Sequence, residues 1–122
     1  MSQLDENAVL NAEKWLNTSI DEQAQQEIIS LRENNVNEFN DAFYRTLEFG
    51  TGGLRGIMGI GTNRMNKYIV AMTTQGFCNY ISENNPGKQI KTVISYDSRN
   101  NSREFAKITA RVMAANGFKV YL

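Results

Sequence analysis

The chain has 122 residues, enough for one domain with its own core, and 13 basic residues balance 13 acidic ones. Without net charge or a basic run, binding to nucleic acid or to a membrane surface is disfavoured. Histidine is absent and Cys78 is the single cysteine, which excludes histidine-based acid–base catalysis, histidine-ligated zinc and an internal disulfide. The polar N-terminus lacks a signal-peptide core, and no apolar run reaches membrane-spanning length, so we expect a cytoplasmic protein.

Residues 1–46 contain no glycine and have the apolar spacing of amphipathic helices. Ser19 and Glu22 form a capping box that opens the second of three helices, and Asn37 is placed to cap the third. The apolar stripes look too narrow for a bundle of their own, so we expect residues 1–46 to be a helical extension packed on the following domain. A partner-binding role is the alternative. The apolar positions are Leu4, Ala8, Ala12, Trp15, Leu16, Ala24, Ile28, Leu31, Phe39, Phe43 and Leu47.

Glycines cluster in the segment Phe49–Asn66. Because glycine is conformationally costly, such a cluster indicates backbone at positive φ, or backbone that must approach a ligand or strand closely. Thr51, Arg55, Thr62 and Arg64 are interleaved with the glycines, and exposed amides beside a guanidinium suit an anion such as phosphate. A mobile loop or a bulged hairpin without a ligand is the alternative, but apolar residues within the segment disfavour a disordered linker. We expect a short strand that turns back on itself or bulges.

The two standard glycine-loop motifs are absent from this segment. A Walker loop requires lysine directly after its second glycine, but Thr62 follows Gly61. A dinucleotide fingerprint that begins at Gly50 would need glycine where Arg55 stands, and one that begins at Gly59 would need it where Arg64 stands.

A long helix is predicted after the glycine segment. Asn66 is placed to cap this helix, and the turn signal Asn84–Gly87 ends it. Gly76 is expected at a close contact with a neighbouring element. The side chains expected to face inward are Ile69, Met72, Phe77, Tyr80 and Ile81. Cys78 lies in the same pattern, and we interpret it as a packed thiol.

The β-branched run Ile90–Tyr96 predicts a buried strand. Ser102 is expected to cap the next helix, with Glu104 complementing the helix dipole and Gly117 as the C′ residue. Residues 118–122 begin another strand. The order βαβαβ predicts an α/β fold with a parallel or mixed sheet. Because a parallel strand needs a following connection, we expect the chain to be the N-terminal fragment of a longer protein.

The run Phe49-Gly50-Thr51-Gly52-Gly53-Leu54-Arg55-Gly56 resembles the opening signature of the α-D-phosphohexomutases, the phosphoglucomutase/phosphomannomutase family. Three later runs are similar to the branch that holds bacterial phosphoglucomutase-like enzymes and phosphopentomutases. They are Asn63-Arg64-Met65-Asn66, Gln75-Gly76 and Tyr96-Asp97-Ser98-Arg99. The motifs agree in order and spacing, and the resemblance implies that residues 47–122 are the first part of the family's α/β domain I.

The resemblance implies that the parent protein interconverts hexose 1-phosphate and hexose 6-phosphate. The implied route uses a phosphoserine, Mg²⁺ and a hexose 1,6-bisphosphate, and the implied substrates are glucose or mannose phosphates. The family's serine, metal and sugar loops are not found in this chain. We therefore expect these loops downstream of Leu122, no Mg²⁺ ligands in this fragment, and no activity of the fragment by itself. A phosphopentomutase of the same family and a non-enzymatic phosphate-binding α/β module are the alternatives.

Site residues are carried over from the family motif position by position. Arg55 matches the arginine beside the phosphoserine and is the catalytic candidate. Thr51 either gives the phosphate a hydroxyl contact or satisfies local backbone. Gly52 and Gly53 are expected to bring backbone close to the phosphate, although the family often has serine at position 52. Arg64 is either a phosphate contact or a solvated side chain.

Asp97 and Arg99 follow the strand predicted over residues 90–96. Open α/β sheets place ligands at the carboxyl ends of their strands, so these two residues are expected near the site. A carboxylate and a guanidinium two positions apart can pair with each other or cap the next helix. We expect this structural role, in which the pair holds the site entrance in shape.

Overall fold

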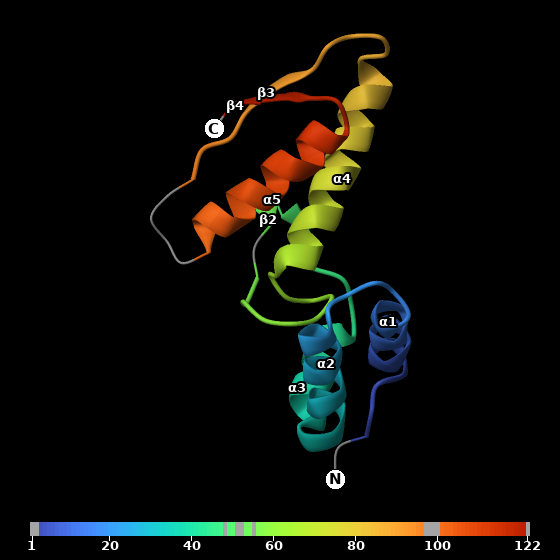
Figure 1. Ribbon diagram of the computed structural model, residues 1–122. Coiled ribbons are helices and arrows are strands. Elements are labelled where there is room, and N and C mark those ends of the chain that lie inside the picture. Colours follow the sequence, from blue (N-terminus) through green and yellow to red (C-terminus); the bar gives the residue numbers. More distant parts are fainter. Residues whose placement is uncertain (1–2, 48, 51–52, 55, 97–100, 122) are drawn as a thin grey trace. The chain divides into compact units, whose positions relative to one another are not determined.

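A computed structural model describes residues 3–47, 49–50, 53–54, 56–96 and 101–121 (Figure 1). The chain divides into two compact units, Met1–Asn66 and Lys67–Leu122. In chain order the described elements are α1 (Glu6–Leu16), α2 (Glu22–Asn34), α3 (Val36–Phe43), β1 (Phe49–Gly50), β2 (Gly53–Leu54), α4 (Lys67–Asn84), β3 (Lys91–Val93), α5 (Ser102–Ala115) and β4 (Lys119–Tyr121). The predicted α/β class is confirmed. None of the described helices is both long and apolar enough to cross a bilayer.

The three helices of the first unit begin at Asp5, Asp21 and Asn35, whose side chains accept a hydrogen bond from the backbone N–H three residues further on, at 2.8 to 3.2 Å. The predicted caps at Ser19 and Asn37 are therefore wrong by two residues each. Asp21 has extended backbone and a carboxylate that complements the helix dipole more strongly than a hydroxyl does, so α2 starts behind it.

The apolar stripes of α1, α2 and α3 pack on one another, with α3 in contact with both other helices. Phe39, Phe43 and Ile28 are fully buried. The Trp15 ring meets the Phe43 ring edge-on, with 5.9 Å between the ring centroids, and the centroid of the Phe39 ring lies 5.2 Å from that of Phe43. The stripes thus bury an aromatic core among themselves, although they looked too narrow to do so. Packing of these helices on the following domain stays a prediction.

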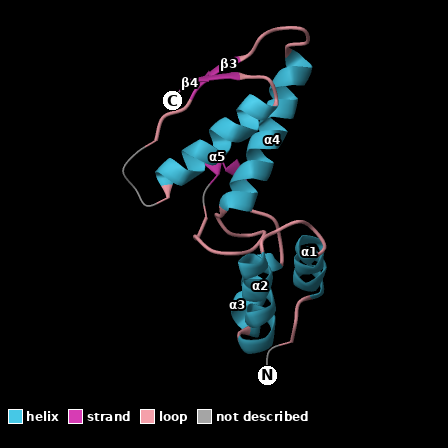
Figure 2. Ribbon diagram, in the orientation of Figure 1, coloured by secondary structure: helices cyan, strands magenta, loops and turns pink. Residues whose placement is uncertain are grey.

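In the second unit, β3 and β4 pair in parallel, with Lys91 opposite Lys119 and Val93 opposite Tyr121. The chain crosses between them through α5, and α5 packs against α4 (Figure 2). Cys78, Met113 and Phe118 form the buried core of this unit. Partly buried around them are Ile81, Ile90, Ile94, Val112 and Val120. Burial raises the pKa of the Cys78 thiol, as expected of a packed thiol and not of a nucleophile.

The predicted order of strands and helices is observed, but the glycine segment does not join the parallel sheet described here. Strands β1 and β2 pair with each other in an antiparallel hairpin, and β3 pairs with β4. At the start of α5 the cap position belongs to Asn101, which has a φ of 70°, and not to Ser102 as predicted. Ser102 is instead the first helical residue, while Glu104 lies in the first turn as expected.

Helix α4 buries only part of the predicted face. As predicted, Ile69 is buried and Ile81 packs against the core of the second unit. Val70, Thr74 and Cys78, at intervals of four residues, are buried. The Thr74 hydroxyl is satisfied within the helix, since it donates to the Val70 carbonyl oxygen at 2.7 Å. Met72, Phe77 and Tyr80, predicted to face inward, are 58%, 50% and 67% exposed. The close contact predicted at Gly76 is also wrong, because a Cβ there would meet no atom within 4 Å.

Candidate functional site

The glycine hairpin (residues 49–54) is the first part of the candidate site. Phe49 pairs with Leu54 and Gly50 with Gly53, so the strand turns back on itself as predicted. Gly53 is therefore a strand residue of the hairpin. Thr51, Gly52 and Arg55 lie outside the described residues, and so do Asp97 and Arg99. Their predicted roles stay predictions.

The anchor loop (residues 57–66) follows the hairpin and closes on itself. Met58 and Met65 form a parallel bridge, and the Met65 N–H donates to the Ile57 carbonyl oxygen at 2.8 Å. The Asn66 side-chain amide donates to the carbonyl oxygens of Gly59 and Gly61, both at 2.9 Å. These contacts fold the loop into a closed turn directly before α4 begins.

The same loop caps the C-terminal end of α3. The last carbonyls of a helix lack partners within the helix and need donors from elsewhere. The Asn63 N–H donates to the Ala42 carbonyl oxygen at 2.9 Å, and the Asn63 side-chain amide donates to that of Asp41 at 3.0 Å. The Thr62 hydroxyl donates to the Arg45 carbonyl oxygen at 2.6 Å. The anchor loop therefore supplies what the helix end requires.

Two glycines allow this close approach. Gly61 has a φ of 133°, and a Cβ on it would lie 2.9 Å from the Ala42 Cβ and closer still to the Ala42 carbonyl oxygen. Gly59 has a φ of 151°. Both positions need glycine for its backbone conformation, and Gly61 needs it for space as well. The reason predicted for the glycine cluster, positive φ and close backbone approach, is thus confirmed at these two positions.

Arg64 joins the anchor loop to α3 through its side chain, which is buried. Its Nη2 donates to Asp41 Oδ2 at 2.6 Å and to Glu38 Oε1 at 3.1 Å. Its Nη1 donates to the backbone oxygens of Asp41 and Asn63 at 3.3 and 3.1 Å. Burial lowers the pKa of Arg64, but the hydrogen bonds and charges of Asp41 and Glu38 outweigh burial and raise it above its ordinary value. A retained cation at this helix end complements the helix dipole.

Of the two roles predicted for Arg64, the solvated side chain does not fit a residue that is 3% exposed. Each of its four Nη hydrogens has an acceptor in the protein, so a phosphate would have to displace one of them. The phosphate contact stays a prediction. The acids Glu38 and Asp41 were not foreseen, because they lie 26 and 23 residues before their partner and no local pattern joins them to it.

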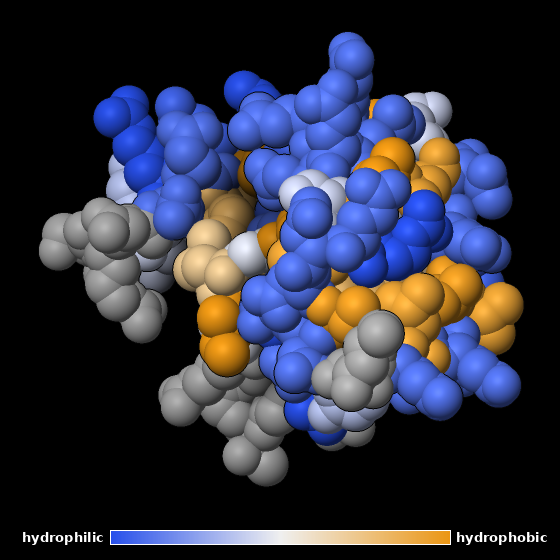
Figure 3. Space-filling view, turned by 90° about the horizontal axis from the view of Figure 1, so that it is seen from below, coloured by the Kyte–Doolittle hydropathy of each residue, from blue (hydrophilic) through white to orange (hydrophobic). Residues whose placement is uncertain are grey.

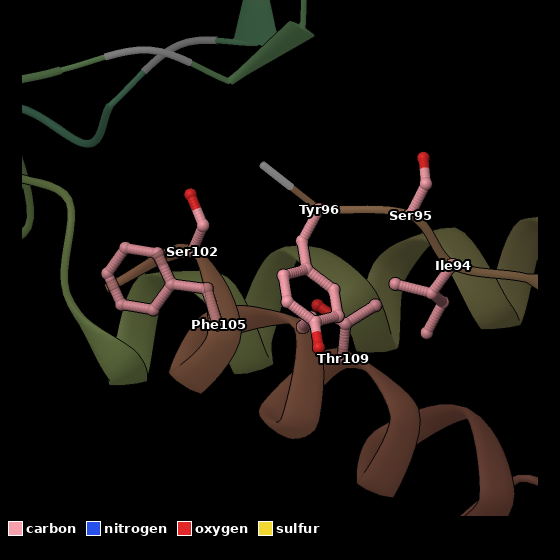
Figure 4. Close-up of a pocket in the computed structure, with 7 residues that line it drawn as sticks. Ile94, Ser95, Tyr96, Ser102, Phe105 and Thr109 are labelled. Carbon is pink, nitrogen blue, oxygen red and sulfur yellow. The ribbon is translucent and has the colours of Figure 1, made fainter. Parts of the chain in front are cut away.

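In the second unit, a cavity of 520 Å³ lies between the chain that continues from the carboxyl end of β3 and the first turns of α5. It is lined by Ile94, Ser95, Tyr96, Ser102, Phe105, Ala106 and Thr109. The Tyr96 ring reaches toward α5 beside Thr109 (Figure 4). This is the sheet edge at which open α/β folds place ligands, and Tyr96 directly precedes Asp97 in the chain.

A metal site is not among the features that the described residues form. Within them, no group of three or more histidine, cysteine, aspartate or glutamate side chains lies close enough together to hold a metal ion. The Mg²⁺ implied by the family resemblance therefore has no ligand set in the part of the chain that the structure describes.

Comparison with known proteins decides the family. A sequence model described as phosphoglucomutase/phosphomannomutase, alpha/beta/alpha domain I, matches residues 46–122. The chain belongs to the phosphoglucomutase/phosphomannomutase family. The match includes the glycine hairpin, the anchor loop and the whole second unit.

Several members of the phosphoglucomutase/phosphomannomutase family are similar to this chain. Human phosphopentomutase is 38% identical over 133 residues, which cover 99% of this chain and 21% of the relative. A phosphoglucomutase of Staphylococcus epidermidis is 40% identical over 70% of this chain and 15% of its own length. Phosphoribomutase of Saccharomyces cerevisiae is 32% identical over 88% of this chain and 17% of its own length. The chain spans about a fifth or less of these relatives. No solved structure matches it significantly.

Proposed function

We propose that this chain is part of a cytoplasmic sugar-phosphate mutase that moves a phosphoryl group between two positions of one sugar. The observation that carries the proposal is the domain I match over residues 46–122, because it contains the glycine hairpin. The relatives named above are mutases of glucose, pentose or ribose phosphates, which supports this reaction class. The non-enzymatic phosphate-binding module has no comparable support.

The predicted substrate pair is hexose 1-phosphate and hexose 6-phosphate, with a phosphoserine and a hexose 1,6-bisphosphate on the route. A specific observation favours a second candidate, a phosphopentomutase. The two relatives that cover 99% and 88% of the chain are named for pentose and ribose, whereas the phosphoglucomutase named above covers 70%. Sugar discrimination depends on parts of the protein beyond this chain, so both substrate classes belong in the test.

The hairpin supports a phosphate-binding role for the residues next to its strands. Gly50 and Gly53 pair across the hairpin. In the sequence, Thr51 and Gly52 lie between these two residues, and Arg55 directly follows Leu54, the last residue of β2. Backbone amides at a glycine turn and a guanidinium beside it bind phosphate by charge-assisted hydrogen bonds. Uncatalysed phosphate-monoester chemistry is so slow that catalysis must lower the barrier by about 20 kcal/mol or more, mostly through positioning and electrostatics.

Mg²⁺ would neutralise phosphate charge in such a reaction. The proposed active site also includes the ligands of Mg²⁺ and the phosphoserine. Asp97 and Arg99 are proposed to hold the entrance of this site in shape. Arg55 is proposed as the catalytic arginine, with Thr51, Gly52 and Gly53 as phosphate-binding candidates. For Arg64, the phosphate contact predicted from the sequence is tested below against a positioning role.

The deciding experiment is a turnover assay of the whole protein with Mg²⁺. Glucose 1-phosphate, mannose 1-phosphate and ribose 1-phosphate are supplied in parallel, and the isomeric phosphates are quantified. We expect turnover of at least one of them, catalytic use of the matching bisphosphate, and loss of turnover when a chelator removes the metal. Binding of phosphate without turnover of any sugar phosphate would instead support the non-enzymatic module.

A further inference from the structure

Both ends of the glycine hairpin are tied to the anchor loop. The Leu47 N–H, before β1, donates to the Thr62 carbonyl oxygen at 2.8 Å. After β2 the chain runs directly into the anchor loop, whose first residue, Ile57, accepts a hydrogen bond from the Met65 N–H at 2.8 Å. The two stems also touch, because a Cβ on Gly56 would lie 2.8 Å from Leu47 Cδ1. The position of the hairpin stems therefore depends on where the anchor loop stands.

Arg64 lies between these two tie points in the chain and fixes the loop to α3. Its side chain is 4% exposed, whereas the side chains of Asp41 and Glu38 are 57% and 51% exposed. The guanidinium is thus removed from water and relies on its two acids, while both acids keep contact with solvent. Taking away one acid leaves a buried cation that is only partly compensated, which is costly.

We propose that Arg64 is a positioning residue of the mutase. Its ion pairs with Asp41 and Glu38, which we call the Arg64 cluster, hold the anchor loop on the end of α3. The anchor loop in turn fixes the stems from which the glycine hairpin extends. Arg64 touches no substrate in this role, and it acts on phosphate only through the hairpin. The kinetic consequence rests on the proposed function, whereas the structural consequence does not.

The structural consequence can be measured without substrate. Asp41→Asn removes a largely exposed charge from the Arg64 cluster, and Arg64→Lys keeps the cation but loses the planar fork that reaches both acids. Glu33→Gln on α2 is the matched control, because it removes one exposed acid outside the cluster. Hydrogen exchange of the whole protein is followed by mass spectrometry in peptides from residues 47–66 and from α1.

We expect exchange in residues 47–66 to become about tenfold faster in both cluster variants, because a charge-assisted contact that restrains local opening is lost. Exchange in α1 should stay at the rate of the wild type, and the control should be unchanged throughout. An equal acceleration in α1 and in residues 47–66 would show general destabilisation instead. That result, or unchanged exchange in residues 47–66, would overturn the proposal.

The kinetic consequence is tested with whichever sugar phosphate the wild-type protein turns over. If Arg64 positions the hairpin, Asp41→Asn should lower kcat about tenfold and change KM by less than about twofold. If Arg64 contacts phosphate directly, releasing it from Asp41 should instead lower KM and leave kcat near the wild-type value, and the positioning role would be wrong. Absence of turnover in the wild type would contradict the proposed function, and hydrogen exchange would still decide on the Arg64 cluster.

Discussion

Arg55 directly follows β2 in the sequence, one residue after Leu54, which pairs with Phe49 at the open end of the glycine hairpin. If it contacts the transferring phosphate, Arg55→Ala should lower turnover of the whole protein by about ten- to a hundredfold, because one charge-assisted contact is lost. Arg55→Lys should also lower turnover although it keeps the charge, since lysine lacks the planar fork. Turnover and melting temperature are measured side by side. Full turnover in both variants, or unfolding of both, would contradict the catalytic role.

The sequence alone does not distinguish the roles of Arg55 and Arg64, the two arginines of the glycine segment. Both lie in motifs of the family within the glycine segment. Arg55 was predicted to act on phosphate, and Arg64 was predicted to be either a phosphate contact or a solvated side chain. The structure describes one of them, Arg64, and gives it partners on α3 that are more than twenty residues away in the chain. Such a contact depends on how a loop closes over a helix end, and no pattern of neighbouring residues encodes it. The glycines, in contrast, did allow a correct prediction from the sequence, because Gly59 and Gly61 adopt the positive φ that their clustering indicated.

Among the elements, the C-terminal end of α5 is the one whose chemistry was predicted most closely. Gly117 is the C′ residue, with a φ of 82°. Its N–H donates to the Ala114 carbonyl oxygen at 3.0 Å, and the Phe118 N–H donates to that of Met113 at 3.1 Å. This is a Schellman motif, and its hydrophobic contact lies in the core of the second unit.

Gly117→Ala should therefore destabilise the protein by about 1 kcal/mol, through backbone strain alone. A Cβ at this position meets no atom within 4 Å, so no steric clash contributes. Gly76→Ala is the matched comparison. It also enters open space, but in the middle of α4, where alanine should stabilise by about 0.5–1 kcal/mol. Urea unfolding of both variants checks the opposite signs, and shifts in the same direction would show that the two glycines are not distinguished by backbone conformation.

The helices whose apolar residues lie on one side were predicted more reliably than the helix with two apolar sides. In α1 and α3 the predicted stripe is the buried one, as Ala12 and Phe39 show. In α4, apolar residues occupy opposite sides, and the side that packs contains the small residues Thr74 and Cys78. Periodicity cannot choose between two such faces, because the choice depends on which neighbour packs there. Helix caps were missed for a related reason, since several Asn, Asp and Ser residues near each start compete for one position.

At the scale of the whole molecule, apolar side chains remain at the surface of the 122-residue chain (Figure 3). Within the described ranges β3 and β4 pair only with each other, and Val93 is 79% exposed opposite Tyr121, which is 47% exposed. Unpaired strand edges beside exposed apolar residues favour pairing between chains. The isolated chain should therefore associate in solution, which light scattering over a range of concentrations detects.

Val93→Lys should reduce this association, because it places a charge on the exposed sheet face. Ser30→Lys on α2 adds the same charge at an exposed position of the first unit and serves as the control. If the unmodified chain stays a compact monomer at high concentration, the unpaired strand edges do not drive association. Equal effects of the two substitutions would show that net charge, and not the sheet, governs association.

The capping of α3 by the anchor loop sets an order of events during synthesis. Helix α3 emerges from the ribosome with its terminal carbonyls unsatisfied, and their donors on Asn63 and Arg64 follow 22 and 23 residues later. Until then Glu38 and Asp41 lack the cation that they bind in the finished fold. The first unit therefore completes only when the glycine segment has been translated. A chain cut at residue 46, where composition changes, would separate a helix from its own cap.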